Sequence, residues 1–201
     1  MKVEPLVLEG KIVRLEPMGL EHVGALSEVG LEESLWTWIP EPRRTRREIE
    51  DYVRSALHDQ DRGTALPFVT IERASGTVIG STRFGNIDTS NKRAEIGWTW
   101  INPKWQRTSV NTEAKFLMLL HAFEEWKCVR VELKTDALNE KSRNAILRIG
   151  AKQEGIFRQH MVCASGRLRD SVYFSIIDSE WMEVKERLTQ FLARPISDKK
   201  S

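Results

Sequence analysis

The polar loop Gln106–Asn111 precedes an amphipathic stretch and has the residue types of a phosphate-binding site. A loop that enters a helix presents unpaired backbone N–H groups and the positive end of the helix dipole, both of which favour a phosphate. Arg107 adds a positive charge, and the hydroxyls of Thr108, Ser109 and Thr112 add donors. An ordinary helix cap is the alternative, because serine and asparagine are good capping residues and the loop lacks glycine.

A carboxylate stands on the strand that leads to this loop. The stretch Ala94–Ile101 alternates with period two and predicts a strand whose apolar face carries Trp98 and Trp100. Glu95 falls on the opposite face, together with Thr99. The carboxylate is therefore expected to point away from the core.

The rest of the chain predicts one α/β (α+β) domain over residues 1–194, followed by a polar tail over 195–201. Its alternation and turn signals indicate a mixed, mostly antiparallel sheet of about seven strands with helices on both faces. Strands are expected at about 11–15, 67–72, 77–84, 94–101, 128–134, 153–158 and 171–177, and helices at about 20–29, 46–57, 111–126, 141–149 and from 179. The 111–126 helix is expected to turn Glu113 toward solvent.

Composition excludes several classes of protein. The 201 residues include 31 lysines and arginines against 29 acids, so the net charge of +2 gives no strong nucleic-acid signal. The basic run Arg43–Arg47 is expected to be a solvated helix start rather than a site for an acidic partner. Two cysteines without a CxxC pair and four scattered histidines predict no metal site.

The chain also shows no targeting or membrane segment at the sequence level. Glu4 and Pro5 interrupt the region where a signal peptide needs an apolar run. The longest apolar runs are far below the ~18 residues of a membrane helix. A cytoplasmic protein without a membrane partner is the expectation.

Several short motifs, in order, resemble the GNAT superfamily of acyl-CoA-dependent N-acetyltransferases. They are Ala94–Trp98, Pro103–Gln106, Asn111–Lys115, Asn139–Ser142, Ile149–Gly155 and Arg158. The segment Asp178–Trp181 before the last helix is similar to the branch of ribosomal-protein alanine N-acetyltransferases. The resemblance runs from Val13 to the final helix. It implies a single domain whose two central strands splay apart around the cofactor, and a homodimer through the C-terminal strands or helices.

The resemblance implies acetyl-CoA as the acyl donor, with no metal. The Gln106–Asn111 loop is similar to the family's pyrophosphate loop, although Ser109 and Asn111 stand where the family has glycine or alanine. The end of the preceding strand would pair with the pantetheine arm, and Asn139 would hydrogen-bond it. The implied cofactor-binding residues are Trp100, Ile101, Gln106, Arg107, Thr108, Ser109, Val110, Asn111, Thr112, Asn139 and Ser142.

The implied reaction is direct attack of a primary amine on the acetyl thioester, which needs a base and a proton for the thiolate. Glu95 is similar to the family's strand glutamate that acts as base; a structural carboxylate paired with an arginine such as Arg83 or Arg93 is the alternative. The family's acidic tyrosine position holds Ile146 here. Ser142 is the candidate acid, and a helix-capping serine, a water or no acid at all are the alternatives.

The acceptor side is the least constrained. Trp36 and Trp38 lie where family members shape the acceptor pocket, and packing in the core is the alternative for both. Arg158 and His160 would stand at the other rim, with His160 as a second base or as a surface residue. The resemblance therefore implies acetylation of a protein N-terminus or a small amine. The alternatives are transfer of a longer acyl group, and a non-catalytic acyl-CoA-binding or interaction protein with a degenerate loop.

Overall fold

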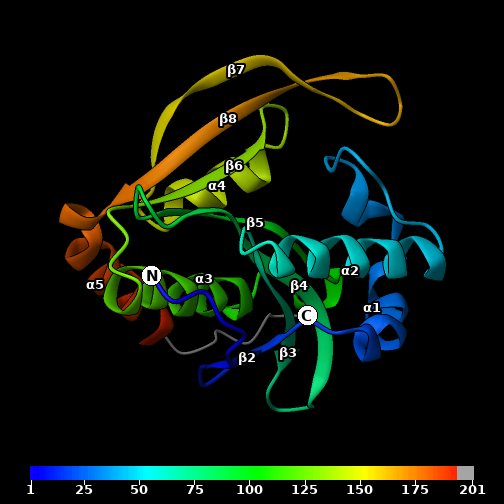
Figure 1. Cartoon of the computed structure of the whole chain (residues 1–201), viewed down its shortest axis with the longest axis horizontal. Helices are drawn as coiled ribbons and strands as arrows, with labels where there is room; N and C mark the ends of the chain where they lie inside the picture. The colour runs from blue at the N-terminus through cyan, green and yellow to red at the C-terminus, as the bar shows by residue number, and fades with distance from the viewer. Residues whose placement is uncertain (194–201) are drawn as a thin grey trace, which may run out of the picture.

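The computed structural model describes residues 1–193, so the expected tail at 195–201 and residue 194 lie outside the described residues. Thirteen helices and strands build one sheet flanked by helices, as Figure 1 shows. In chain order they are β1 (Leu8–Glu9), β2 (Val13–Pro17), α1 (Val23–Gly30), α2 (Arg46–Asp61), β3 (Leu66–Glu72), β4 (Thr77–Asp88), β5 (Arg93–Ile101), α3 (Val110–Leu120), β6 (Arg130–Asp136), α4 (Glu140–Arg148), β7 (Lys152–Val162), β8 (Leu168–Ile177) and α5 (Trp181–Ala193).

The sheet has eight strands in the order β1-β2-β3-β4-β5-β6-β8-β7. Every neighbouring pair is antiparallel except β5 and β6, which are parallel. The predicted mixed, mostly antiparallel sheet is confirmed, with the two-residue strand β1 as the addition that the sequence pattern did not indicate. Two residues carry too little alternation to be recognised as a strand.

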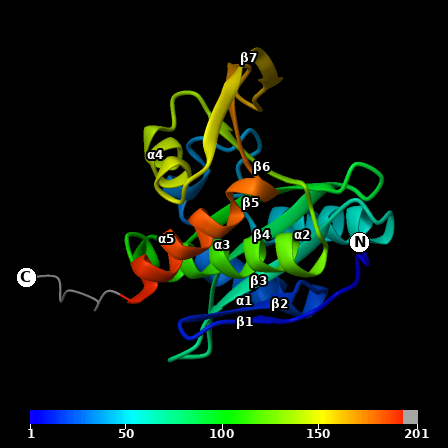
Figure 2. The same cartoon turned by 90° about the vertical axis from the view of Figure 1, so that its left-hand side faces the viewer.

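Helices cover both faces of the sheet. One core cluster packs α3 and α5 against the strands, and a second packs α1 and α2 against the opposite face. Figure 2 shows α3 and α5 lying side by side across the sheet, with α1 and α2 behind it. Tertiary packing of these amphipathic helices supplies most of their stability.

The central strands β5 and β6 pair over only three residues, Arg93 with Arg130, Ala94 with Val131 and Glu95 with Glu132. Beyond Glu95 the two strands have no paired residues, while β6 continues along β8 as far as Asp136. A wedge therefore opens between the second halves of β5 and β6. The expected splay of the central pair is confirmed.

A β-bulge at Trp98 corrects the simple alternation predicted for β5. Arg83 and Ser81 on β4 face Gly97 and Trp100, so β5 has one extra residue over this interval. Trp98 has a φ of 50° and a side chain that is 39% exposed. The inserted residue reverses the alternation, so Trp98 and Trp100 both lie on the face of Glu95 and α2, opposite Ala94 and Ile96. Thr99, which alternation placed beside Glu95, instead turns toward Lys115 of α3.

Helix α3 differs from the predicted 111–126 helix in two ways. It ends at Leu120 and continues as a π-helical turn over His121–Glu125. Glu113, expected on the solvent face, is 5% exposed. Its carboxylate accepts hydrogen bonds from the backbone N–H groups of Lys11, Ile12 and Val13 at 2.9, 2.6 and 2.7 Å. Those donors belong to a distant segment, so the helical period alone could not reveal them.

Candidate active site

The Gln106–Asn111 loop lies at the open end of the wedge. The amide of Gln106 donates to the carbonyl of Ile101 at the end of β5 (2.7 Å), and its oxygen accepts from Lys141 on α4. On the inner side, Arg148 of α4 donates to the hydroxyl of Thr112 on α3 at 2.8 Å. These hydrogen bonds connect the two sides of the wedge across its open end.

Ser109 and Asn111 would cap the first turn of α3 if the loop were an ordinary helix start, but neither side chain does so. The Ser109 side chain makes no capping hydrogen bond, and the buried Asn111 Oδ1 has no partner among residues 1–193. Thr108 instead uses its hydroxyl to bond the Trp105 carbonyl at 2.7 Å and the Val110 N–H at 3.3 Å. The remaining backbone N–H groups in the first turn of α3 are therefore available to bind an anion. Arg107, with a φ of 60°, stands beside them.

The other side of the wedge ends in the cap of α4. Asn139 is the N-cap residue, and its Oδ1 accepts the N–H of Ser142 at 3.0 Å. This bond uses one side of the Asn139 amide and leaves its NH₂ group for another acceptor. The Ser142 hydroxyl makes no hydrogen bond to a described residue, so capping is done by Asn139 rather than by the serine.

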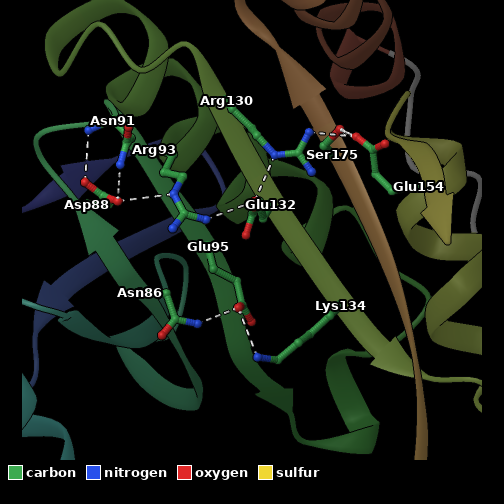
Figure 3. A network of polar contacts seen from close by, with 10 residues as sticks. All are labelled: Asn86, Asp88, Asn91, Arg93, Glu95, Arg130, Glu132, Lys134, Glu154 and Ser175. Carbon is green, nitrogen blue, oxygen red and sulfur yellow. Dashed lines mark hydrogen bonds and ion pairs between the residues drawn. The ribbon is translucent and has the colours of Figure 1, made fainter. Parts of the chain in front are cut away.

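Glu95 is 2% exposed and lies on the sheet face opposite α3. Its Oε2 accepts from Asn86 Nδ2 at 2.8 Å and from Lys134 Nζ at 3.1 Å, as drawn in Figure 3. The arginines considered as partners bind elsewhere: Arg93 contacts Asp88 and Glu132, and Arg83 contacts Asp59. Within residues 1–193, the hydrogen bonds to this carboxylate come from side chains.

A cavity of about 760 Å³ opens beside Glu95. Its wall comes from the end of β4, the β4–β5 turn and strands β5 to β8, which meet here because β5 and β6 are paired at this end. The lining residues are Asn86, Ile87, Asp88, Thr89, Ser90, Arg93, Glu95, Arg130, Glu132, Glu154, Gly155, Phe157 and Tyr173. The arginines and acids of the wall pair with one another through Arg93–Glu132 and Arg130–Glu154 contacts, also seen in Figure 3.

Lys134, which binds Glu95, also lies over two aromatic rings. Its Nζ lies 5.7 Å from the ring centres of both Trp98 and Tyr173. On the other side, the guanidinium carbon of the buried Arg83 lies 4.9 Å from the Trp98 ring centre. Trp98 also lies across Gly85, where any Cβ would meet its ring. Residue 85 must therefore be glycine for the bulge to hold this ring.

His160 lies close to this cluster. Its Nδ1 is 3.0 Å from the Ser171 hydroxyl, and its ring contacts those of Phe157 and Tyr173. Partial burial, followed by the charges of Lys134 and Arg169, lowers the pKa of His160. The lowered pKa favours the neutral imidazole, which is the form that a base requires.

The other acceptor candidates fall in different environments. Trp36 is buried, donates its ring N–H to the Gly30 carbonyl at 2.8 Å and packs 5.7 Å from the Trp100 ring centre, so its place is in the core. Trp38 is half-buried under the Arg167 guanidinium at 5.8 Å. Arg158 is exposed and makes no polar contact with a described residue.

The β7–β8 hairpin reaches across the front of the molecule to the segment between α1 and α2. The N–H of Ala164 in the hairpin turn donates to the carbonyl of Pro40 at 2.9 Å. Behind it, Arg167 binds the buried carboxylate of Asp136 at the end of β6 at 2.5 Å. Figure 1 shows the long hairpin arching toward that segment.

Sequence reasoning missed Asn86, Lys134 and Tyr173 around Glu95. The missing information was the pairing of β5 with β6 and of β6 with β8. Lys134 follows Glu132 on the same face of β6 and Tyr173 is its partner on β8, so alternation together with register would have placed both beside Glu95.

In residues 1–193, no group of three or more His, Cys, Asp or Glu side chains could hold a metal ion. Over the same residues, no helix is both long enough and apolar enough to cross a membrane.

Comparison with known proteins gives consistent matches. Residues 13–152 match the family model of an acetyltransferase (GNAT) domain. The "putative ribosomal N-acetyltransferase YdaF" of Bacillus subtilis is 35% identical over 106 residues, which cover 53% of this chain and only 57% of that protein. A crystal structure of a GCN5-related N-acetyltransferase from Brucella melitensis is 37% identical with a TM-score of 0.85, covering 94% of this chain and 86% of that one. A "putative acetyltransferase" from T. thermophilus is 28% identical with a TM-score of 0.86, covering 96% and 100%.

Proposed function

This chain belongs to the GNAT acetyltransferase family, and from that premise we propose that it moves the acetyl group of acetyl-CoA to a primary amine. One observation carries the proposal: the wedge between β5 and β6 connects an uncapped helix start at one end with a buried carboxylate at the other. The first suits a diphosphate and the second suits a proton acceptor.

The donor would lie in the wedge with its diphosphate on the Gln106–Asn111 loop and the start of α3. No residue of β6 pairs with Trp100 or Ile101, so apart from the Ile101 carbonyl, which accepts from Gln106, this edge of β5 is available to the pantetheine arm. The NH₂ group of Asn139 would reach the arm from the opposite side. Ser142 stands one turn further on α4 with an unused hydroxyl.

Catalysis would then proceed from the cavity side. The amine loses a proton to Glu95, directly or through water, and its nitrogen attacks the thioester carbon. The C–S bond breaks, and its electron pair leaves with the coenzyme A sulfur. Lys134 and Asn86 hold the carboxylate in place for the first of these steps.

The acceptor is proposed to be a protein N-terminus, with a small primary amine as the second candidate. The name of the Bacillus subtilis relative points to ribosomal proteins. The cavity beside Glu95 and the hairpin that meets the α1–α2 segment provide room for a chain end. Trp38 and His160 are the candidate contacts at its rim, with Arg158 further out on exposed β7.

Location and assembly are proposed on separate grounds. Both cysteines, Cys128 and Cys163, are free and buried, as is typical of a reducing cytoplasm. The edge strand β7 exposes Ile156, Phe157 and Val162, which supports a homodimer through the C-terminal strands.

Ligand-induced stabilisation tests the donor site. Saturating acetyl-CoA or CoA should raise the melting temperature, because ligand binding to the native state stabilises it. Ser109→Glu should abolish the increase by placing a carboxylate where the diphosphate binds. Ser165→Glu, the same change in the exposed hairpin turn, should preserve it. No increase with any acyl-CoA would overturn the proposal.

Release of the CoA thiol then identifies the chemistry. Turnover of acetyl-CoA with an N-terminal peptide or a small-amine panel supports N-acetylation. Faster turnover of longer acyl-CoAs would favour the alternative acyltransferase. Binding without turnover of any amine would favour an acyl-CoA-binding protein.

A further inference from the structure

Helix α3 holds a lysine inside the protein. Lys115 is 7% exposed, and lysine is almost never buried unless it is paired. Its Nζ donates to the hydroxyl oxygens of Thr99 at 2.6 Å and Thr82 at 3.5 Å. Among residues 1–193, no carboxylate lies within ion-pair distance of this amine. Glu113 on the same helix is bound to the amides before β2.

The amine lies directly under the bulge of β5. Thr99 follows the bulge residue Trp98 and belongs to the half of β5 that β6 leaves unpaired. Thr82 lies on β4 with its hydroxyl 2.8 Å from that of Thr99. Lys115 therefore approaches the wedge from the α3 face, while Glu95 approaches it from the other face.

The proposed path of the donor ends at this point. A diphosphate at the start of α3 and an arm along Ile101 and Trp100 bring the sulfur to the level of Thr99, the next residue along β5 toward the closed end. The half-buried Thr99 hydroxyl, which donates to the Gly97 carbonyl at 3.3 Å in this structure, is a side-chain donor at this level of the strand.

The leaving sulfur needs such a donor. Breaking the C–S bond leaves a thiolate, and the family's tyrosine acid is replaced by Ile146 in this chain. We infer that Thr99 hydrogen-bonds the departing sulfur and that Lys115, acting through Thr99, supplies its proton. This inference rests on the proposed acetyl transfer.

The proton that reaches the sulfur comes from Lys115 through the Thr99 hydroxyl. As the electron pair of the C–S bond moves to sulfur, the Thr99 hydroxyl gives its proton to sulfur and takes one from the Lys115 ammonium. Lys115 remains as a neutral amine and regains a proton from water after the products leave. Burial lowers the pKa of Lys115 to about 7, so the amine can both give and regain a proton near neutral pH.

Ultraviolet titration of the CoA thiolate tests the inference without needing an acceptor. Thiolate absorbance of CoA bound to the wild type should appear about 1 pH unit or more below that of free CoA, because Thr99 donates to the thiolate and the negative sulfur raises the pKa of Lys115, so that the two groups titrate together. Lys115→Met and Thr99→Val should return the ionisation toward that of free CoA. Lys152→Met, which removes an exposed lysine on β7, should leave it as in the wild type.

Binding of desulfo-CoA, which lacks the sulfur, controls for folding of the site. Both variants should bind it as tightly as the wild type does, while their affinity for CoA at alkaline pH falls about tenfold or more, as a difference of one pKa unit requires. Normal desulfo-CoA binding with an unchanged thiol ionisation in Lys115→Met would overturn the role of Lys115 and leave the proposed function intact. Failure of the wild type to bind CoA at all would overturn both.

Discussion

Two buried carboxylates show how this fold separates structure from chemistry. Glu113 on α3 is fixed by three backbone N–H groups, two from the turn before β2 and one from the first residue of β2. Glu95 on β5 is just as buried but is held by two side chains, Asn86 and Lys134, beside a cavity. Backbone donors cannot move without unfolding the turn, whereas side-chain donors can shift as an amine arrives. The number of hydrogen bonds matters less than where the donors come from.

Glu95→Gln should give the largest effect. The amide keeps the shape and loses the proton acceptor, so turnover should fall by about 10²–10⁴, the usual contribution of a general base. The melting temperature should change little, because Asn86 and Lys134 can still reach an amide oxygen. Thiol release with a verified acceptor measures this, and Glu50→Gln on the exposed face of α2 serves as the matched control. Undiminished turnover would remove Glu95 from the mechanism.

Glu113→Ala should have the opposite outcome to Glu95→Gln, with a loss of stability and no loss of turnover. Three backbone donors lose their acceptor, which should cost about 2–4 kcal/mol of the free energy of unfolding. For a domain of this size that corresponds to a fall in melting temperature of roughly 10 °C. Turnover per folded molecule should remain normal below the transition. A catalytic defect without loss of stability would contradict the structural role of Glu113.

Lys115→Met should stabilise the protein by about 1 kcal/mol or more, since it replaces a buried amine by an apolar chain of similar shape. The gain should depend on pH. Folding lowers the pKa of this lysine from 10.5 to about 7, so between these values the unfolded chain binds a proton that the folded chain lacks, and wild-type stability falls as pH decreases. Melting curves at pH 7 and pH 10 should therefore show the larger gain at pH 7. Equal gains would contradict the burial of an unpaired amine.

Lys134→Met should lower turnover about tenfold, a smaller loss than that of Glu95→Gln. In this variant the Glu95 carboxylate keeps its hydrogen bond from Asn86 but loses the one from the Lys134 ammonium. A hydrogen bond to a charged group is worth about 1.5–3 kcal/mol. Steady-state kinetics should show a reduced kcat with a stable fold. A fall in stability comparable to that of Glu113→Ala would mean that Glu95 and Glu113 are held in the same way.

The sequence predicted those features that depend on local pattern. The β5 strand and the loop before α3 follow from alternation and capping chemistry, whereas α4 is capped by Asn139 and not by Ser142, the capping residue considered from the sequence. Glu113 was expected in solvent because its partners lie about a hundred residues away. Trp98 was expected in the core because a bulge is set by the neighbouring strand. Lys115 stood in a motif that supported the family resemblance, but its burial depends on how α3 packs under β4 and β5.

The short ladder between β5 and β6 has a mechanical consequence. The eight strands behave as two smaller sheets, β1–β5 and β6–β8, which share only three residue pairs. Each half has its own hydrogen-bond network, so the amides along the unpaired edge of β5 should exchange with solvent deuterium sooner than those between β3 and β4. A ligand lying in the wedge would act as a missing ninth strand. Binding would slow that exchange on both sides at once and make two loosely coupled halves unfold as one.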